Sequence, residues 1–295
     1  MSVKTLLRQW ADPILRHLTF SLPVQTVGGK MWIPIVEGTG LGVYDQIIRG
    51  EEAWKLKIFK SLPEAPGSLF VDVGANLGQT LLQLRMVDAE RPYLGFEPNP
   101  DCLHYDFALI RRNGFRNVDL VATGLGESTD VLTLYLPPKR STDSTATLLK
   151  ELRPDRQYDA RHVLIFNEEH LSGLVAGRAI GFVKVDVEGA ELEVFKGIKY
   201  LLNQERPPVM CEVLFTDPKG DLEASRVRNA ELVSLLQAIG YQVLQIRKSD
   251  DYSQITDLVA VDSFPSDFHS PANSALCDYL FLPAEKVENL RGRLG

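Results

Sequence analysis

One stretch decides the fold: Leu69-Phe70-Val71-Asp72-Val73-Gly74-Ala75-Asn76-Leu77-Gly78-Gln79-Thr80. Its first half is a near-continuous apolar run, which is typical of a central parallel strand buried on both faces. Gly74 and Gly78 allow the backbone to turn sharply and to approach a ligand without Cβ clashes. The leucines that follow predict a helix over 77–86. A glycine loop that joins a strand to a helix is where open α/β sheets bind nucleotides.

The composition is that of an ordinary folded protein. The chain has 295 residues, of which 44% are hydrophobic and 24% charged, enough for a substantial core. Because the net charge is -7, a global basic field is absent and we expect no nucleic-acid partner. No apolar run reaches the roughly 18 residues of a membrane span, so we expect no stable membrane insertion. The dispersed Cys102, Cys211 and Cys277 predict reduced thiols in a cytoplasmic protein.

Residues 1–66 predict an N-terminal extension made of a helix and a hairpin. Apolar residues recur at helical spacing from Leu6 to Leu18. We interpret this helix as docking on its own domain or on the partner in a homodimer, with a membrane-surface helix as the alternative. The hairpin is expected over 24–35, turning at Gly28-Gly29. A glycine-rich passage over 37–42 predicts a loop that can lie over a pocket, and 51–62 predicts a helix.

A second strand is predicted over 92–97, and it ends on an acid, Glu97. In nucleotide-binding βαβ units an acid at the tip of the second strand accepts hydrogen bonds from ribose hydroxyls. A carboxylate suits this task because its two oxygens can hold two vicinal hydroxyls. Pro98 and Pro100 stop the strand and let a helix begin near Asp101.

Strands continue to alternate with helices to the end of the chain. Strands are predicted over 117–123, 132–136, 180–187, 209–215, 241–246 and 278–282, with helices after Gly189 and over 224–239. This alternation predicts an α/β fold with a mostly parallel sheet covered by helices on both faces. The polar segment 137–160 is either a mobile lid over the substrate or a solvated insertion.

The stretch 180–191 is the second informative one, because a buried strand again ends in acids and a glycine. Asp186 and Glu188 are expected beside the glycine loop in the usual strand order, next to the reacting group. Asp186 is the first candidate for a general base or a metal ligand. Glu212, on the next strand, can join it in a site for a divalent metal, although we favour a site without metal. An acid at Glu191 is equally explained by the helix dipole.

An acid inside the glycine loop bears on the choice of ligand. Asp72 would repel a pyrophosphate but suits a cationic sulfonium ligand, and the loop lacks the first G-x-G pair of dinucleotide sites. These residues favour S-adenosylmethionine over NAD. An NAD-linked oxidoreductase and a non-catalytic scaffold with the same fold remain alternatives. His162 and His170 are further candidates for substrate contacts.

With these residues placed, the chain resembles the FkbM family of S-adenosylmethionine-dependent methyltransferases. Three stretches carry the resemblance: Phe70-Val-Asp-Val-Gly-Ala-Asn-Leu-Gly78, Gly95-Phe-Glu-Pro-Asn-Pro100 and Phe182-Val-Lys-Val-Asp-Val-Glu-Gly-Ala-Glu191. The resemblance covers roughly residues 65–245. It implies a Rossmann-like class I methyltransferase with a seven-stranded sheet whose last strand is antiparallel. It therefore implies a methyltransferase domain over 67–295, with an insertion near 137–170.

The resemblance also assigns roles to single residues. The cofactor-binding residues it implies are Asp72, Gly74, Asn76 and Gly78 in the loop, Glu97 for the ribose, Pro98 and Asn99 beside the adenine, and, by position alone, Thr123 and Gly124 flanking the adenine. Asp186, Glu188 and Glu191 match the family signature, and Asp186 and Glu188 are the expected catalytic residues. The implied reaction is methyl transfer to a hydroxyl of a small molecule such as a sugar or a secondary metabolite. The N-terminal region and 137–170 are expected to select that acceptor.

Overall fold

The structure, a computed structural model, describes residues 18–62, 67–138, 141–143, 145–152, 157–264 and 267–294. The helix predicted from Leu6 to Leu18 lies, except for Leu18 itself, outside the described residues.

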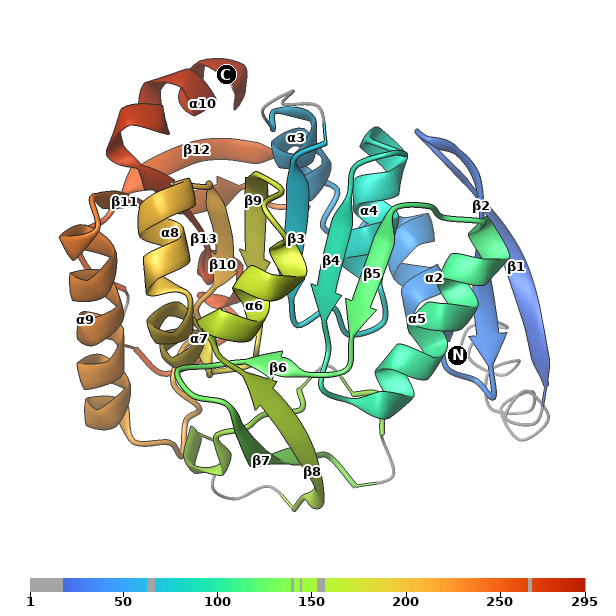
Figure 1. The fold of residues 1–295 in the computed structure, drawn as a ribbon, viewed down its shortest axis with the longest axis horizontal. Helices are drawn as coiled ribbons and strands as arrows, with labels where there is room; N and C mark the ends of the chain where they lie inside the picture. Colours follow the sequence, from blue (N-terminus) through green and yellow to red (C-terminus); the bar gives the residue numbers. More distant parts are fainter. Residues whose placement is uncertain are drawn as a thin grey trace.

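An eight-stranded sheet with helices on both faces organises the fold (Figure 1). In spatial order its strands are β12 (Ile255–Ala260), β11 (Tyr241–Lys248), β13 (Asp278–Pro283), β10 (Val209–Glu212), β9 (Ile180–Val185), β3 (Leu69–Val73), β4 (Tyr93–Phe96) and β5 (Val118–Val121). The strands from β10 to β5 are parallel, whereas β13 is antiparallel to both β10 and β11. The predicted α/β class, the mostly parallel sheet and the antiparallel last strand are confirmed.

The predicted number of seven strands is wrong by one. The additional strand, β12, pairs antiparallel with β11 alone and forms the edge of the sheet. An edge strand needs less apolar surface than a central one, and only Leu258 of β12 is buried. With Asp257 in its middle, the segment lacks the apolar run that reveals the central strands.

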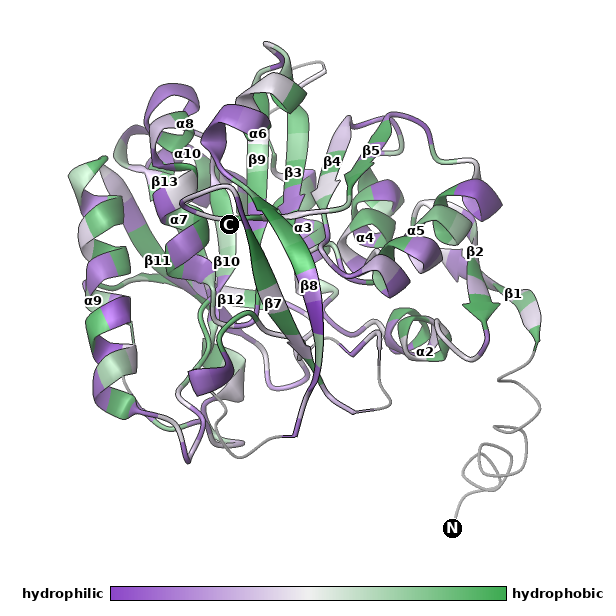
Figure 2. Cartoon of the chain, turned by 60° about the horizontal axis from the view of Figure 1, so that its bottom comes forward, coloured by the Kyte–Doolittle hydropathy of each residue, from purple (hydrophilic) through white to green (hydrophobic). Residues whose placement is uncertain are grey.

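The helices form two layers that enclose the sheet. Helices α3 (Trp54–Lys60), α4 (Gln79–Val87) and α10 (Val287–Leu294) pack on one face, and α6 (Glu168–Val175), α7 (Glu191–Gly197), α8 (Lys199–Glu205) and α9 (Leu222–Ala238) on the other. Alternate side chains of β3 supply the two cores: Val71 and Val73 belong to the core that also contains residues of α6, α7, α8 and α9, whereas Phe70 packs against Phe59 of α3. Figure 2 shows α9 with alternating hydrophobic and hydrophilic residues, as expected of a helix with one buried face. Helices α6, α8 and α10 were not predicted, because each buries only two or three residues, whereas the equally short α3 and α7 bury four and five.

The predicted hairpin is present as β1 (Thr19–Thr26) and β2 (Gly29–Val36), with its turn one residue earlier than expected, at Val27-Gly28. It packs through Ile33 and Ile35 on α4 and α5 (Pro100–Asn113). The predicted glycine-rich loop is present over 37–40, and its last two residues begin a further helix, α2 (Leu41–Arg49), with Gly40 at the N-cap.

A separate three-stranded sheet stands at the carboxyl edge of the main one. Its strands are β6 (Gly124–Leu125), β8 (Asp159–Phe166) and β7 (Asp130–Leu136), and short 3-10 helices occur at Lys150–Leu152, Ser274–Leu276 and Ala284–Lys286. The segment predicted as a lid or solvated insertion therefore runs from β7 into β8. Within it, Thr147 Oγ1 donates a hydrogen bond to the Glu188 carbonyl oxygen (2.8 Å), which ties the small sheet to the end of β9.

A buried ion pair joins the two central strands. Asp72 of β3 and Lys184 of β9 are direct partners in the strand register, and their charged atoms are 3.1 Å apart. Tyr93 Oη donates to the second oxygen of Asp72 (2.6 Å). Lys184 Nζ also donates to the Gly74 carbonyl oxygen (2.8 Å) and lies 3.5 Å from Asp186 Oδ2. The pair thus holds the glycine loop against the end of β9.

Gly74 is required at this junction for two reasons. Its φ is 85°, in the region that side-chain-bearing residues rarely adopt. A Cβ atom at this position would lie 1.9 Å from the Asp186 carbonyl oxygen. The loop and the end of β9 can therefore approach this closely only with glycine.

We expect Lys184→Met to lower the free energy of unfolding by about 3–5 kcal/mol, because it leaves the Asp72 carboxylate buried without its partner. Urea denaturation measures this. The matched control is Lys196→Met, which removes a partly exposed pair with Glu231 and should cost at most about 1 kcal/mol. Equal small losses in both variants would show that the Asp72–Lys184 pair does not stabilise the fold.

Candidate active site

A cavity of about 410 Å³ opens at the carboxyl ends of β3, β4, β9 and β10. Ligand pockets in proteins measure about 300–1,000 Å³, so this cavity has room for one ligand of nucleoside size. Its charged and amide lining residues are Gln46, Glu52, Lys55, Asn76, Gln79, Glu97, Asn99, Asp143, Lys184, Asp186, Glu188 and Glu212. Of the predicted cofactor residues, Gly74, Asn76, Glu97, Pro98, Asn99 and Gly124 line it.

Glu97 forms one end of the cavity. Its two carboxylate oxygens accept hydrogen bonds from the backbone N–H groups of Asn76 and Asn99, both at 2.8 Å. Burial raises the pKa of Glu97 from 4.5 to about 7, although these two hydrogen bonds oppose the rise. Each oxygen retains a further lone pair, so the carboxylate can also accept from two hydroxyls of a ligand. The carboxylate therefore has unused acceptor capacity at the end of β4.

Asn76 and Asn99 place the backbone groups that Glu97 uses. Asn76 adopts a left-handed conformation (φ 51°), which asparagine tolerates better than most residues. Asn99 is the N-cap of α5, and its Oδ1 accepts from the Asp101 N–H (3.1 Å). Its Nδ2 donates to the Ser141 carbonyl oxygen, so the insertion contributes to this end of the cavity.

Two acids with opposite pKa shifts, Asp186 and Glu212, line the cavity where β9 and β10 end. Burial alone would raise the pKa of Asp186, but the charges of Lys184 and Lys55 hold it below its ordinary value. Burial, followed by the charges of Asp186 and Asp278, raises the pKa of Glu212 well above its ordinary value. Asp186 is therefore ionised near neutral pH, whereas Glu212 holds a proton more tightly than an ordinary glutamate does.

Glu188 has a strained backbone and a position between two cavities. Its φ is 56°, a left-handed conformation that is uncommon for glutamate. It lines the main cavity and also a second one of about 340 Å³. Glu212 is the other acid shared by both cavities.

The second cavity lies between β10, α9 and the segment that precedes β13. Its polar lining residues include Thr216, Asp217, Ser225, Arg228, Asn229, His269 and Ser274. Arg228 is occupied by Glu193 at 2.6 Å and by the Gly189 carbonyl oxygen at 3.0 Å. Glu191 also lines this cavity, and its Oε1 accepts from the Gly189 N–H (2.8 Å). This contact at the start of α7 agrees with a role in capping.

Three predicted cofactor residues do not line the cavity. Asp72 is fully buried and paired with Lys184, so the predicted direct attraction between its carboxylate and a cationic ligand is wrong. Gly78 is the N-cap of α4, and its missing Cβ leaves room for Leu109 and Asp106. Thr123 is buried and donates to the Leu164 carbonyl oxygen (2.7 Å). These residues shape the loops around the site without facing a ligand.

The histidine candidates also lie elsewhere. His170 stacks on Phe166 and hydrogen-bonds Asn167 (2.9 Å), and neither His162 nor His170 lines either cavity. His269, which the sequence did not single out, lines the second cavity.

The N-terminal region supplies residues that the sequence analysis missed, namely Gln46, Glu52 and Lys55. One signal was available. Lys55 lies among Trp54, Ile58 and Phe59 on the buried face of α3, and a lysine on an apolar face is rare unless its charge has a partner.

Two further observations concern metals and membranes. Within the described ranges, no group of three or more His, Cys, Asp or Glu residues is placed to hold a metal ion, so the third ligand that a site at Asp186 and Glu212 needs was not found there. None of the helices in the part of the chain that the structure describes is long and apolar enough to cross a membrane.

Comparisons with known proteins agree with this geometry. The family model described as the methyltransferase FkbM domain matches residues 72–243, more than half of the chain. "Methyltransferase 1" of Beauveria bassiana (strain ARSEF 2860) is 27% identical over 207 residues, which are 63% of this chain and 77% of that protein.

Solved structures show weaker similarity. Methyltransferase FkbM from Methylobacillus flagellatus KT has a TM-score of 0.42 and 16% identity over 95% of this chain, which spans 60% of that chain. An S-adenosylmethionine-dependent methyltransferase from Aquifex aeolicus has a TM-score of 0.39 and 13% identity, covering 82% of this chain and 96% of that one. The match of the family model, over the residues that build the cavity, is decisive: the chain belongs to the FkbM family of S-adenosylmethionine-dependent methyltransferases.

Proposed function

We propose that this methyltransferase acts on a hydroxyl oxygen of a small polar molecule, such as a sugar or a secondary metabolite. The observation that carries the proposal is an ionised carboxylate, Asp186, at the end of the cavity away from the ribose-type site at Glu97. S-Adenosylmethionine, when bound, supplies an electrophilic methyl group. The protein must then position the acceptor and take its proton.

The residues of the main cavity suit this cofactor. Glu97 has lone pairs for two ribose hydroxyls, and Pro98, Asn99 and Gly124, which line the same cavity, are proposed to contact the adenine. The cavity carries more carboxyl groups than ammonium groups, which suits a ligand with a cationic sulfonium. Gly74 and Asn76, in the glycine loop after β3, also line this cavity.

Asp186 is proposed as the proton acceptor. As the acceptor oxygen forms its bond to carbon, that oxygen gains positive charge and its proton becomes strongly acidic. A carboxylate of low pKa can take such a proton, and its negative charge favours the developing positive charge beforehand. Lys184 keeps Asp186 ionised and oriented. Glu188, the second expected catalytic residue, lines the route from one cavity to the other.

The second cavity is proposed as the acceptor site. It shares Glu188 and Glu212 with the main cavity, so a molecule bound there can present a hydroxyl to Asp186. Asn229 and His269 offer hydrogen-bonding groups, and Phe215 offers an apolar surface, a combination that suits a polyhydroxylated ring. Thr145 of the insertion also lines this cavity, in keeping with the expectation that the insertion helps to select the acceptor.

Binding and methylation measurements distinguish the proposed hydroxyl methyltransferase from an oxidoreductase and from a methyltransferase with another kind of acceptor. Calorimetry should detect binding of S-adenosylmethionine and S-adenosylhomocysteine but not of NAD, whose binding an oxidoreductase requires. A screen with labelled cofactor against sugars and metabolite alcohols, with and without magnesium, should then identify an acceptor. Binding of the cofactor without methylation of any hydroxyl compound, while amines or carbon acceptors are methylated, would contradict the proposal.

We expect Asp186→Asn to lower kcat by about 10²–10⁴-fold, the contribution of a positioned general base. The dissociation constant of S-adenosylhomocysteine should change much less. The matched control is Asp257→Asn on the exposed edge strand β12, which should leave kcat unchanged. Equal losses of turnover and cofactor affinity would make Asp186 a binding residue.

The affinity for S-adenosylhomocysteine should rise with pH through about 7, the pKa that burial gives Glu97. Below this pH Glu97 is protonated and offers the ribose a poorer acceptor, so the affinity between pH 6 and pH 8 should rise up to about tenfold. Calorimetry in buffers of different ionisation enthalpy should detect proton release on binding near pH 7. Glu97→Gln should bind more weakly and lose the pH dependence, whereas Glu205→Gln, at an exposed position, should keep both. A slope that survives in Glu97→Gln would assign it to another group.

A further inference from the structure

Two lysine ammonium groups line the main cavity, and they differ in how many of their N–H donors have an acceptor. Lys184 Nζ has three acceptors in reach: Gly74 O at 2.8 Å, Asp72 at 3.1 Å and Asp186 at 3.5 Å. A lysine ammonium has three N–H donors, so Lys184 has none to spare for a ligand. Any direct contact between a cation of this cavity and a ligand therefore falls to Lys55.

Lys55 is buried but only partly satisfied. Its residue is 7% exposed, and Nζ donates to Glu52 Oε1 at 2.6 Å. Among the residues that the structure describes, Glu52 is its only hydrogen-bond partner. Two of the three donors of Lys55 are thus available at the cavity wall. Leaving donors of a buried charged group unused is costly, which points to a ligand that accepts them.

The surroundings keep Lys55 charged and fixed in place. Although burial opposes it, the charge of Glu52, followed by those of Asp278 and Asp186, raises the pKa of Lys55. Glu52 is itself held, because its second oxygen accepts from Gln46 Nε2 (3.2 Å). The Trp54 ring lies 5.5 Å from Lys55 Nζ. The ammonium is therefore pre-organised, and little order has to be gained on binding.

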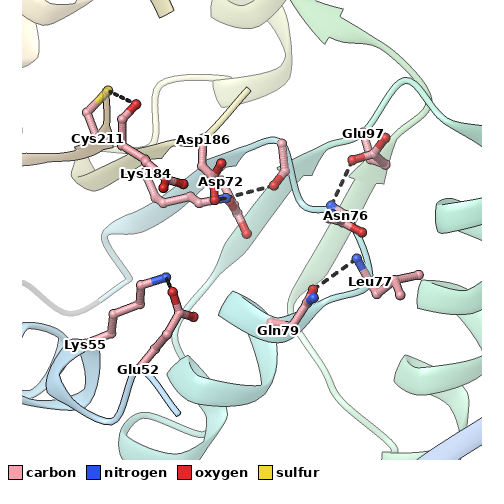
Figure 3. A network of polar contacts seen from close by, with 12 residues as sticks. Glu52, Lys55, Asp72, Asn76, Leu77, Gln79, Glu97, Lys184, Asp186 and Cys211 are labelled. Carbon is pink, nitrogen blue, oxygen red and sulfur yellow. Dashed lines mark hydrogen bonds and ion pairs between the residues drawn. The ribbon is translucent and has the colours of Figure 1, made fainter. Parts of the chain in front are cut away.

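Lys55 and Glu97 lie on opposite sides of the glycine loop (Figure 3). Figure 3 also shows Lys184 and Asp186 between them, next to that loop. A ligand whose ribose binds Glu97 and whose chain follows the loop past Gly74 therefore brings its far end toward Lys55. In S-adenosylmethionine that far end carries a carboxylate, the group whose oxygens match free ammonium donors.

We propose that Lys55 binds the carboxylate of the methionine end of the cofactor and thereby selects adenosyl sulfonium ligands that carry this group. The assignment rests on the proposed use of this cavity for S-adenosylmethionine. It gives a cofactor role to α3, which lies outside the residues that the family model matches. It concerns the anionic end of the ligand, whereas the role predicted for Asp72, which is paired with Lys184, concerned the cationic sulfonium.

Two ligands and two variants test the assignment by calorimetry. The ligands are S-adenosylhomocysteine and the 3-aminopropyl thioether of adenosine, which lacks only the carboxylate. The variants are Lys55→Met and the matched control Lys57→Met, which removes an exposed lysine from the same helix. Circular dichroism and thermal unfolding verify that each variant is folded.

Wild-type protein should bind S-adenosylhomocysteine about 10- to 100-fold more tightly than the aminopropyl compound, the range for hydrogen bonds between charged groups. Lys55→Met should weaken only S-adenosylhomocysteine, so that the two ligands bind alike, and Lys57→Met should match the wild type. A third variant, Lys55→Arg, should retain part of the preference for S-adenosylhomocysteine over the aminopropyl compound. If Lys55→Met does not fold, the two ligands are compared on Lys55→Arg and on wild-type protein, where equal affinities would still overturn the assignment.

Other results overturn the assignment in distinguishable ways. If wild-type protein binds both ligands equally, or if Lys55→Met weakens both equally, Lys55 does not recognise the carboxylate. If Lys55→Met changes neither affinity but raises the KM of an anionic acceptor, Lys55 serves the acceptor instead. If wild-type protein binds no adenosyl ligand, the proposed function itself fails.

Discussion

The structure depends on one buried ion pair, Asp72 with Lys184. A lone charge on either central strand would be costly to bury, whereas two opposite charges at register positions on neighbouring strands offset much of that cost. The same lysine also donates to the Gly74 carbonyl oxygen. The pair is therefore both a structural element of the sheet and the support of the loop that forms one wall of the cavity.

The three carboxyl groups of the site differ in their pKa shifts because their surroundings differ. Lys184 and Lys55 hold the pKa of Asp186 below its ordinary value, while burial raises the pKa of Glu212. Glu97, with no cation in contact, has a pKa near 7 because burial dominates. Three acids at one sheet edge thus have pKa values shifted in different ways, as the proposed combination of proton acceptance and hydroxyl binding requires. Lys55 adds a cation with donors to spare at the end where the acids would otherwise dominate.

Features that a short stretch of sequence encodes were predicted correctly, and features that depend on distant residues were not. The apolar runs around Val71 and Val183 predicted buried parallel strands, and Glu97 and Asp186 at strand ends predicted acids at a common edge; both predictions are confirmed as positions in the fold. Edge strand β12 and the short helices were missed because half-exposed segments need little apolar periodicity. The direction of the Asp72 side chain was also wrong, because its partner lies more than a hundred residues away in the sequence.

By itself, the sequence determined the α/β class, the glycine loop, the position of Glu97 at the end of the next strand, and the family resemblance, since each of these depends on residues close together in the chain. Only the tertiary structure decided which charged groups face a ligand. Lys55, Lys184 and Glu212 come from α3, β9 and β10, and their charge states depend on burial and on neighbours from other elements. Electrostatic energy depends on distance and on exclusion of water in three dimensions, and neither quantity is present in the order of residues along the chain.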